Sequence, residues 1–319
     1  MMIKSLAKHL PHPLLLRLHH HYDLARKSAM ARMVSWRTGL PLLERLELPR
    51  LKTSDTVFVL GSGSSINNIP DKRWEVIGRH DTIALNFWPV HTFLPRIYLF
   101  ESIYRVEGYE LMFDRFQDLL QRRAGDYQNV TKIVSELQPL GPRQLLFEIP
   151  EGFRSNLYVG YSTCIAARSE GEFIAGIRYL RRRGNFEPGN YVAWHFKCGG
   201  SVIAAMSLAA RMNYRRLVLC GVDLGKAEYF YQDSERYPET CHWEFAPRSQ
   251  PHLTARRYEW GLPAQEAIYH FKREILDAAG IELFVENRSS TLFPQIPDVS
   301  PQLFEQLAES RVRHESLRR

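Results

Sequence analysis

A turn of glycines and serines that follows a short apolar run is the first feature with the residue types to bind a ligand. The run is Thr56–Leu60, and the turn consists of Gly61, Ser62, Gly63, Ser64 and Ser65. Glycines at the end of a strand let the backbone approach a phosphate or ribose without an intervening Cβ, and serine hydroxyls can cap a following helix. Several classes of nucleotide enzyme use such a pair of glycines, and a tight turn without a ligand is the alternative. We expect a nucleotide site here.

The residues after this turn restrict the kind of nucleotide. Ile66 occupies the place of the third glycine in the dinucleotide fingerprint, and the next apolar run, Thr82–Leu85, ends in Asn86. Enzymes that bind NAD usually carry an acidic residue there to hold the ribose. Asn86 therefore argues against NAD, and by the same reasoning against S-adenosylmethionine.

A second candidate anion site precedes a helix. Gly199 and Gly200 come directly before Ser201, which opens a helical pattern that extends to Met212. The free amides and the dipole of a helix N-terminus favour a phosphate. The alternative is that Ser201 only caps the helix and that the glycines allow close packing.

A third group of polar residues follows the apolar run Leu217–Cys220. It comprises Asp223, in the sequence Gly-Val-Asp, and then Tyr229, Phe230 and Tyr231. Ligands of open α/β sheets bind beyond the carboxyl ends of the strands, which is where Asp223 is expected. A tyrosine hydroxyl there can donate a hydrogen bond to a leaving phosphate without adding a charge, whereas Phe230 is equally well explained by the packing of a lid.

Histidine is suited to deprotonate a sugar hydroxyl, because its pKa lies near neutrality. His252 and His242 fall in a segment rich in aromatic residues, and His195 ends an apolar run. Three adjacent histidines near the N-terminus are His19, His20 and His21. Contiguous residues do not share one helix face, so we expect these three to be solvated rather than metal ligands.

Short apolar runs recur along the chain and predict the strands of a parallel sheet covered on both faces. The further runs are Ile97–Phe100, Leu145–Phe147, Tyr191–Trp194 and Ile281–Val285. Helical patterns lie between several of them, at Phe173–Arg183, Ser201–Met212 and Ala264–Ala279, the last ended by Gly280. This alternation predicts an α/β fold with a Rossmann-like, doubly wound and mostly parallel sheet.

Three segments depart from that alternation. Residues 1–50 have a helical, amphipathic pattern interrupted by prolines, so we expect a basic extension of broken helices packed outside the core. Residues 225–262 are rich in aromatic residues and prolines and lack a period, which predicts a lid inserted into the main domain of residues 51–300. Residues 301–319 are expected to form a basic tail.

The composition is that of an ordinary globular protein, with 45% hydrophobic and 24% charged residues. The 4 cysteines form no C-x-x-C pair, and no run approaches the roughly 20 apolar residues of a membrane-spanning helix. We therefore expect a cytoplasmic protein with reduced cysteines and no nucleic-acid partner. Much of the net charge of +7 lies at the two ends among leucines, so an anionic surface such as the inner membrane is a further partner to weigh against solvated tails.

These segments, in this order, resemble the bacterial sialyltransferases of glycosyltransferase family 42. In that family a strand runs into a Gly-x-Gly-x-Ser turn, a second strand ends in an asparagine that contacts the nucleotide, and a donor-binding helix leads to a strand that closes in Ser-Gly-Ile-Asp. The matching residues here are Gly61, Gly63, Ser65, Asn86, Gly200, Ser201, Gly221 and Asp223. The stretch from Ser201 to Asp223 aligns without a gap, and the resemblance extends from about Val57 to Asn287.

The chain also departs from the family. Ser62 and Ser64 stand where the family turn has an asparagine and a proline, and Gly225 replaces one of two phosphate-binding tyrosines. The other tyrosine matches Tyr231, with Tyr229 as a substitute for the missing one. The catalytic histidine of the family matches His252 best, and His242 is its rival.

The resemblance implies inverting transfer of an acidic sugar from a CMP donor to a glycan of the bacterial surface, in lipopolysaccharide or capsule biosynthesis. Tyr231 would steady the departing phosphate and His252 would act as the base. The sequence does not choose among sialic acid, Kdo and related nonulosonic acids, nor does it give the acceptor, the linkage or the oligomeric state. No D-x-D motif follows a strand, so we expect no required cofactor, although a divalent metal would be compatible.

Two alternatives stand beside this reading. A pterin pyrophosphokinase-like nucleotide enzyme would need a metal-binding carboxylate cluster, for which Asp223, Asp233 and Glu235 are the nearby candidates. A catalytically silent nucleotide-binding protein is the other, because one tyrosine of the family site is missing.

Overall fold

A parallel sheet organises the part of the chain that this computed structural model describes, which is residues 11–103, 110–137, 145–190, 194–225, 228–240 and 261–316. Within those ranges the sheet has seven strands in the order β5-β4-β3-β2-β1-β8-β9, and β6 pairs with β7 in a separate ribbon. The strands are β1 Thr56–Leu60, β2 Asp81–Leu85, β3 Ile97–Glu101, β4 Thr131–Glu136, β5 Leu157–Val159, β6 Tyr161–Thr163, β7 Trp194–Phe196, β8 Arg216–Cys220 and β9 Glu282–Val285.

The order of the strands gives the sheet one switch point, on the two sides of which successive strands are added in opposite directions. From β1 to β5 each new strand is added on one side, and β8 and β9 are then added on the other side of β1. β1 and β8 are therefore parallel neighbours, with Leu60 paired to Cys220. In doubly wound sheets the crevice beyond such a switch point is the usual place for a ligand.

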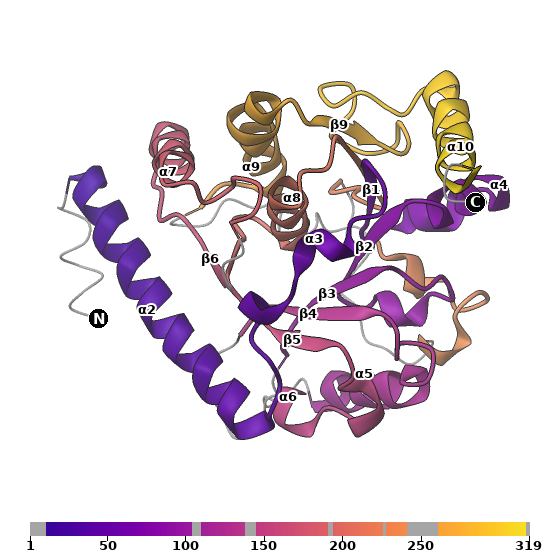
Figure 1. The fold of residues 1–319 in the computed structure, drawn as a ribbon, viewed down its shortest axis with the longest axis horizontal. Helices are drawn as coiled ribbons and strands as arrows, with labels where there is room; N and C mark the ends of the chain where they lie inside the picture. The colour runs from indigo at the N-terminus through magenta and orange to yellow at the C-terminus, as the bar shows by residue number, and fades with distance from the viewer. Residues whose placement is uncertain are drawn as a thin grey trace.

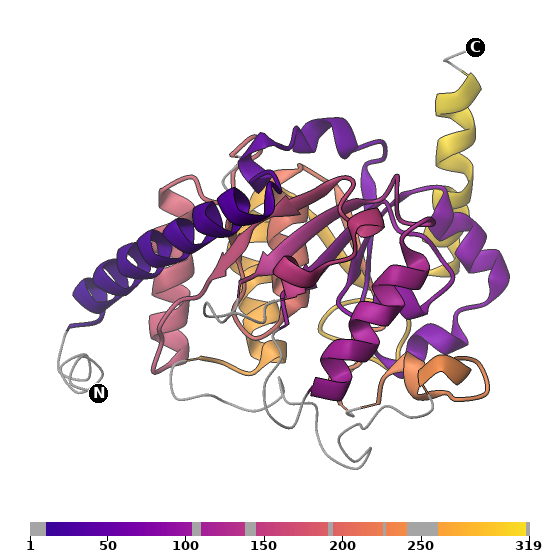
Figure 2. The same cartoon turned by 90° about the horizontal axis from the view of Figure 1, so that it is seen from below.

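Helices flank the sheet (Figures 1 and 2). They are α2 His12–Thr38, α3 Leu48–Leu51, α4 Asp71–Gly78, α5 Glu110–Arg123, α6 Leu145–Glu148, α7 Glu170–Arg182, α8 Ser201–Arg211, α9 Ala264–Phe271 and α10 Pro301–Ser316. The mostly parallel sheet between helices confirms the predicted Rossmann-like α/β class. The predicted helix Ala264–Ala279 is also present, as α9 followed by a π-turn and a 3-10 turn that end at Gly280, where φ is 69°.

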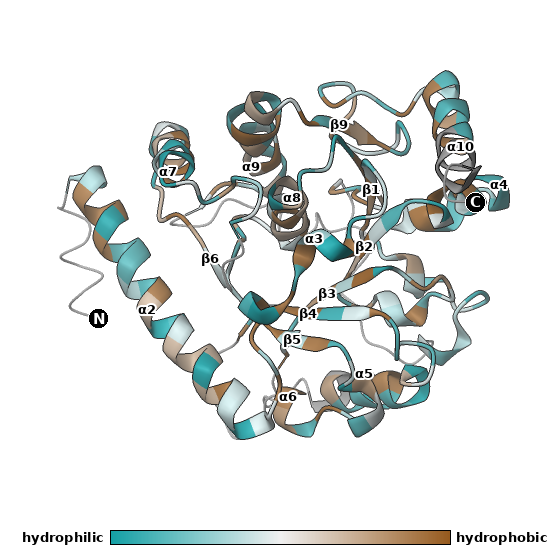
Figure 3. Cartoon of the chain, in the orientation of Figure 1, coloured by the Kyte–Doolittle hydropathy of each residue, from teal (hydrophilic) through white to brown (hydrophobic). Residues whose placement is uncertain are grey.

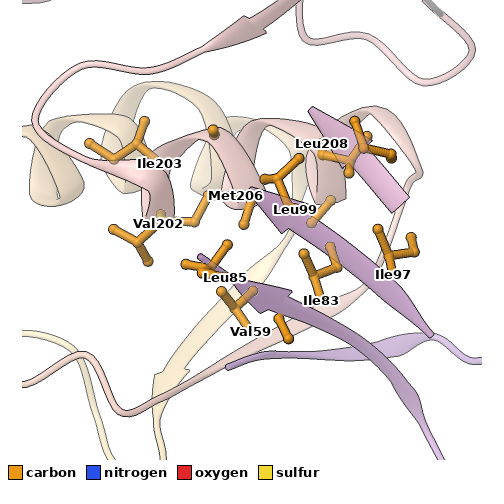
Figure 4. Close-up of a cluster of buried hydrophobic side chains, with 14 of the residues drawn as sticks. Val59, Ile83, Leu85, Ile97, Leu99, Val202, Ile203, Met206 and Leu208 are labelled. Carbon is orange, nitrogen blue, oxygen red and sulfur yellow. The ribbon is translucent and has the colours of Figure 1, made fainter. Parts of the chain in front are cut away.

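The centre of the hydrophobic core lies between α8 and the first three strands. Every residue of α8 is buried. Figure 4 shows side chains of this helix, such as Ile203 and Met206, lying over Val59 of β1, Leu85 of β2 and Leu99 of β3. The packing fixes the N-terminus of α8 close to the ends of these strands.

The N-terminal segment differs from the expected broken helices outside the core. α2 is one helix of 27 residues, with a proline in its first turn and Gly39 as its left-handed C-cap. Proline is tolerated in the first turn because the amide that it lacks has no partner there anyway. Met30, Ala31 and Val34 of α2 are buried in the main core, so the prediction of packing outside the core was wrong.

Other local predictions also fail. Leu145–Phe147 was predicted as a strand but lies in the helix α6. A short apolar run is compatible with a strand or with a buried helix, and its periodicity does not distinguish the two. β4 was missed, since buried Lys132 interrupts its apolar pattern; its Nζ donates to the carbonyls of Tyr127 and Val130. The expected C-terminal tail is the helix α10, which contacts α4.

Two of the cysteines are joined. Cys164, after β6, and Cys198, after β7, form a disulfide with their Cα atoms 5.1 Å apart. The expectation of reduced cysteines is thus not met at this pair. The residues are 34 positions apart, and only the pairing of β6 with β7 brings them together. No helix in the described ranges is both long and apolar enough to cross a bilayer.

Candidate nucleotide-binding site

A cavity of about 580 Å³ lies at the carboxyl edge of the sheet, over the switch point between β1 and β8. It is lined by residues from each of the segments predicted to contact the nucleotide or its phosphate, namely the glycine turn, the end of β2, the start of α8 and the segment after β8. The lining residues from these segments include Gly61, Ser62, Gly63, Asn86, Gly199, Gly200, Ser201, Gly221, Asp223, Tyr229 and Tyr231. Strands far apart in the sequence end side by side here, so the tertiary structure brings the separate predictions into one site.

The glycine turn is shaped by its contact with the end of β8. The amide of Gly61 donates to the carbonyl of Cys220, and that of Gly63 donates to the carbonyl of Gly221, both at 2.8 Å. A Cβ on Gly61 would lie 2.5 Å from the Gly221 oxygen, and one on Gly63 would clash with the Asp223 carboxylate. Gly63 has φ −66°, so it is required for this close approach and not for a left-handed backbone.

Asp223 anchors the turn from the other side. Its carboxylate accepts hydrogen bonds from the amide of Ser65 at 3.0 Å and from the hydroxyl of Ser65 at 2.6 Å. Ser64 and Ser65 begin a short 3-10 helix and, unlike Ser62, do not line the cavity. Asp223 lines the cavity, but its hydrogen bonds to Ser65 hold the glycine turn in place.

Asn86 and Ser201 form the floor of a polar cluster. Asn86 has φ 50°, and its Nδ2 donates to the Ser201 hydroxyl at 3.2 Å. The Ser201 hydroxyl in turn donates to Glu101. Asn86 Oδ1 is buried and makes no hydrogen bond to the described residues, which leaves it as an acceptor at the cavity wall.

The cluster continues through an ion triad that the sequence analysis missed. Lys197 Nζ lies 3.0 Å from Glu101 Oε1 and also pairs with Glu136. Burial would raise the pKa of Glu101, but the Lys197 ammonium and the Ser201 hydrogen bond outweigh it and hold that pKa below its usual range. Burial would lower the pKa of Lys197, yet Glu101 and Glu136 raise it. Glu101 and Lys197 are therefore both charged at neutral pH.

A recognisable signal was present for these residues. Glu101 ends β3, Glu136 ends β4, and Lys197 directly follows β7. The rule that identified Asn86 and Asp223, a polar residue at the carboxyl end of a strand, applies to them equally. The sequence pattern does not reveal the ends of β4 and β7, because β4 has no continuous apolar run and the apolar run around Trp194 ends before Lys197.

Aromatic side chains form the opposite wall. The rings of Tyr229 and Tyr231 stack with centroids 5.1 Å apart, and Tyr231 also contacts Phe87. Burial raises the pKa of both tyrosines, most strongly that of Tyr231, so their hydroxyls stay neutral at physiological pH. The wall is tied to the glycine turn, because the amide of Phe230 donates to the Ser62 carbonyl at 3.0 Å and that of Ser64 to the Glu228 carbonyl at 3.1 Å.

Of the three histidines considered as the base, only His195 lies within the described residues. His252 and His242 lie outside the described residues, as does most of the predicted lid. His195 is fully buried in β7 with Nδ1 3.2 Å from Arg211, and it does not line the cavity. Burial, assisted by Arg211, holds its pKa well below the usual value. His195 is therefore placed as a core residue and not as the base.

The three N-terminal histidines were expected to be solvated, but His20 is not. It is buried, with its ring 5.8 Å from that of Trp194.

The acidic residues considered as metal ligands do not meet at the cavity, because Asp233 and Glu235 do not line it whereas Asp223 does. Among the residues that the structure describes, no three histidine, cysteine, aspartate or glutamate side chains gather closely enough to hold a metal ion.

Comparison with known proteins gives no relative from which a function could be transferred. No family model matches the sequence, and no curated protein is significantly similar to it. The assignment of a function therefore depends on the geometry of the site.

Proposed function

We propose that this chain is an inverting glycosyltransferase that moves an acidic sugar from a CMP donor to a hydroxyl of a bacterial surface glycan. The observation that carries the proposal is that segments picked out separately along the sequence line one cavity at the switch point of the sheet. A cavity of about 580 Å³ lies within the range of small-molecule sites.

In this proposal the cytidine monophosphate lies across the glycine turn. Gly61 and Gly63 line the cavity, where their backbone would contact the ribose phosphate, and Asn86 Oδ1 accepts a hydrogen bond from an amino group such as that of cytosine. The N-terminus of α8 at Gly200 and Ser201 provides amides and a favourable dipole for donor oxygens. The hydroxyls of Tyr231, which is buried, and of Tyr229, which is partly buried, are neutral and donate to the departing phosphate without a change of charge.

The transfer reaction requires a base that deprotonates the acceptor hydroxyl. His252 is our candidate for this base, because it matches the catalytic histidine of glycosyltransferase family 42 best. A positioned imidazole contributes about 10²–10⁴-fold to such a step. His252→Ala should therefore lower turnover by that range while CMP affinity stays constant, because the base contacts the acceptor. His242→Ala is the matched control and should retain most of the turnover; the opposite result would exchange the two roles. Activity of the wild type should fall at acid pH as the imidazole is protonated.

One feature of the cavity favours a second candidate, a metal-dependent nucleotide enzyme of the pyrophosphokinase type. The lining carboxylates are Glu101, Glu136, Asp223 and Glu228, whereas Lys197 is the one cationic side chain among the described lining residues. An anionic CMP-sugar is repelled by carboxylates, whereas a magnesium ion is attracted to them and can bridge them to the phosphates of a nucleotide. In the transferase reading, Lys197 and the α8 terminus must outweigh this repulsion.

Isothermal titration with CMP, ATP, NAD and S-adenosylmethionine, each with and without magnesium, separates the candidates. The proposal expects CMP to bind in the absence of metal and the other ligands to bind far more weakly. Magnesium-dependent binding of ATP in preference to CMP would replace the transferase by the second candidate. Release of CMP from CMP-sialic acid or CMP-Kdo in the presence of an acceptor distinguishes an active transferase from a silent nucleotide-binding protein.

A further inference from the structure

Large apolar side chains are exposed on one helix. Of the described residues, the large hydrophobic ones that are exposed are Leu14 at 45%, Leu18 at 54%, Tyr22 at 65%, Trp36 at 83% and Leu94 at 45%. All except Leu94 belong to α2. Isolated apolar residues on a surface are normal, but a concentration on one element requires an explanation.

The four residues share one face of the helix. Leu14, Leu18 and Tyr22 follow one another at intervals of one turn, and Trp36 comes five turns after Leu18, since about 3.6 residues make a turn. Ala25 and Ala29 continue the same stripe and are exposed as well. We call Leu14, Leu18, Tyr22 and Trp36 the outer stripe of α2.

The outer stripe is distinct from the face by which α2 joins the protein. Leu16, Met30 and Val34 are buried in the core on the opposite side. α2 runs along the edge of the molecule (Figure 1), and apolar positions recur along its length (Figure 3). The residues of the outer stripe are exposed. The helix therefore has two apolar faces, and the rest of the described chain covers one of them.

The charges beside the outer stripe have one sign. The exposed basic residues of α2 are Arg17, Arg26 and Arg37, which lie beside the stripe, and Arg32, which comes five turns after Leu14 and lies on the stripe itself. The single acidic residue of the helix, Asp23, is buried and pairs with Lys27 at 3.0 Å and with Arg26 at 3.3 Å. No acidic residue precedes Asp23 in the chain, and Lys4 and Lys8 add to the positive charge.

We propose that α2 is an interfacial helix that docks its outer stripe onto an anionic lipid bilayer. Helices that lie in a membrane surface combine an apolar stripe with flanking arginines, and tryptophan and tyrosine favour the level of the headgroups. The arginines around the outer stripe complement the negative potential of anionic lipids. The same charges oppose the pairing of α2 with α2 of a second copy, because like charges would meet. The proposal is independent of the proposed reaction.

Cosedimentation of the full chain with phosphatidylcholine vesicles, with and without one third phosphatidylglycerol, tests the proposal. The protein should pellet with the anionic vesicles and be released as salt rises, because exposed charges are screened within about 8 Å at physiological ionic strength. Leu18→Glu combined with Trp36→Glu should weaken binding at least about tenfold, since charged residues are expelled from the interface. Both positions are exposed, so the melting temperature should stay unchanged.

Leu94→Glu is the matched control, because Leu94 is as exposed as Leu14 but lies outside α2. It should bind the vesicles like the wild type. The proposal is overturned if the wild type does not pellet, if the double variant pellets equally well, or if Leu94→Glu loses as much. It is also overturned if the lipid-free protein is an oligomer that the double variant dissociates, which would assign the outer stripe to a second copy.

Discussion

At the scale of single residues, the site is held by contacts between the ends of neighbouring strands. Asp223 after β8 fixes Ser65 after β1, and Asn86 after β2 fixes Ser201 at the start of α8. The residues expected to contact a ligand therefore also position one another. A substitution in this set should act on binding through the shape of the site as well as through a lost contact.

Gly63→Ala tests how tightly the turn is constrained. The new Cβ would collide with the Asp223 carboxylate, so the bond from Ser65 to Asp223 must give way. We expect CMP affinity to fall by about tenfold or more, which corresponds to about 1.4 kcal/mol or more. Titration calorimetry measures the loss, and Gly125→Ala, which has open space around it, should bind normally. Unchanged affinity in Gly63→Ala would refute this account of the turn.

Lys197→Met tests the ion triad. Removal of the cation leaves the half-buried carboxylates of Glu101 and Glu136 without their ion-pair partner, so we expect a cost between roughly 1 kcal/mol, as for an exposed ion pair, and about 3–5 kcal/mol, as for a fully buried one. Glu136→Gln in the same chain should recover part of the loss, because it removes one of the unpaired charges. Chemical unfolding measures both effects. Lys272→Met breaks the ion pair with Asp277 at the surface and should lower the free energy of unfolding by no more than about 1 kcal/mol. An equal loss in Lys197→Met and Lys272→Met would show that the ion triad is as exposed to solvent as the surface pair.

At the scale of elements, α2 determines the environment of its own histidines. His20 lies on the buried side of the helix, with its ring against those of Trp194 and Tyr179. Burial, followed by the charges of His21 and Arg183, lowers the pKa of His20 from 6.5 to about 4. This histidine is therefore neutral in the folded protein at physiological pH.

The lowered pKa of His20 predicts a pH dependence of stability. The unfolded chain takes up a proton at this residue below 6.5, whereas the folded protein resists it down to about 4, so stability must fall as the pH decreases through that window. Near pH 5 the contribution is about 2 kcal/mol. His20→Gln should therefore lose less stability between pH 7 and pH 5 than the wild type, as measured by urea unfolding. Leu14→Gln, at an exposed position of the same helix, removes no titratable group and should keep the wild-type slope. Equal slopes in all three proteins would disprove the assignment.

At the scale of the whole molecule, the order of the strands decides where the cavity lies. β1 and β8 are neighbours although they are separated by most of the domain, and the glycine turn and Asp223 meet only for that reason. The ribbon of β6 and β7 has a similar role, because it places Lys197 beside the ends of β3 and β4. The disulfide closes this ribbon directly before Gly199 at the cavity.

The disulfide between Cys164 and Cys198 should make the protein sensitive to reductants. It closes a loop of 34 residues, and a crosslink of that length stabilises a protein by about 3–4 kcal/mol through the unfolded chain. A reductant should therefore lower the melting temperature of the wild type by several degrees. It should have no such effect on Cys164→Ser, which is the control. A wild-type melting temperature that is indifferent to reductant would contradict a bond between the two cysteines.

Local patterns in the sequence predicted the class of fold and most of the segments that line the cavity. Apolar runs such as Thr56–Leu60 and the helical pattern from Ser201 are local, because burial on both faces of a parallel strand and on one face of a helix leaves a signature in neighbouring residues. The glycine turn, Asn86 and Asp223 could be located for the same reason, since each follows such a run. The proposed reaction and the role of His252 stay predictions.

Which residues meet depends on the tertiary structure. Glu101, Glu136 and Lys197 each follow or end a strand, but they become a half-buried triad only because three strands end side by side. Cys164 joins Cys198 through strand pairing, and α2 buries one apolar face while leaving the other exposed. Contacts of this kind depend on the order of strands and on the orientation of a helix against the core. Both are set by the free energy of packing the entire chain, which no local pattern of residues encodes.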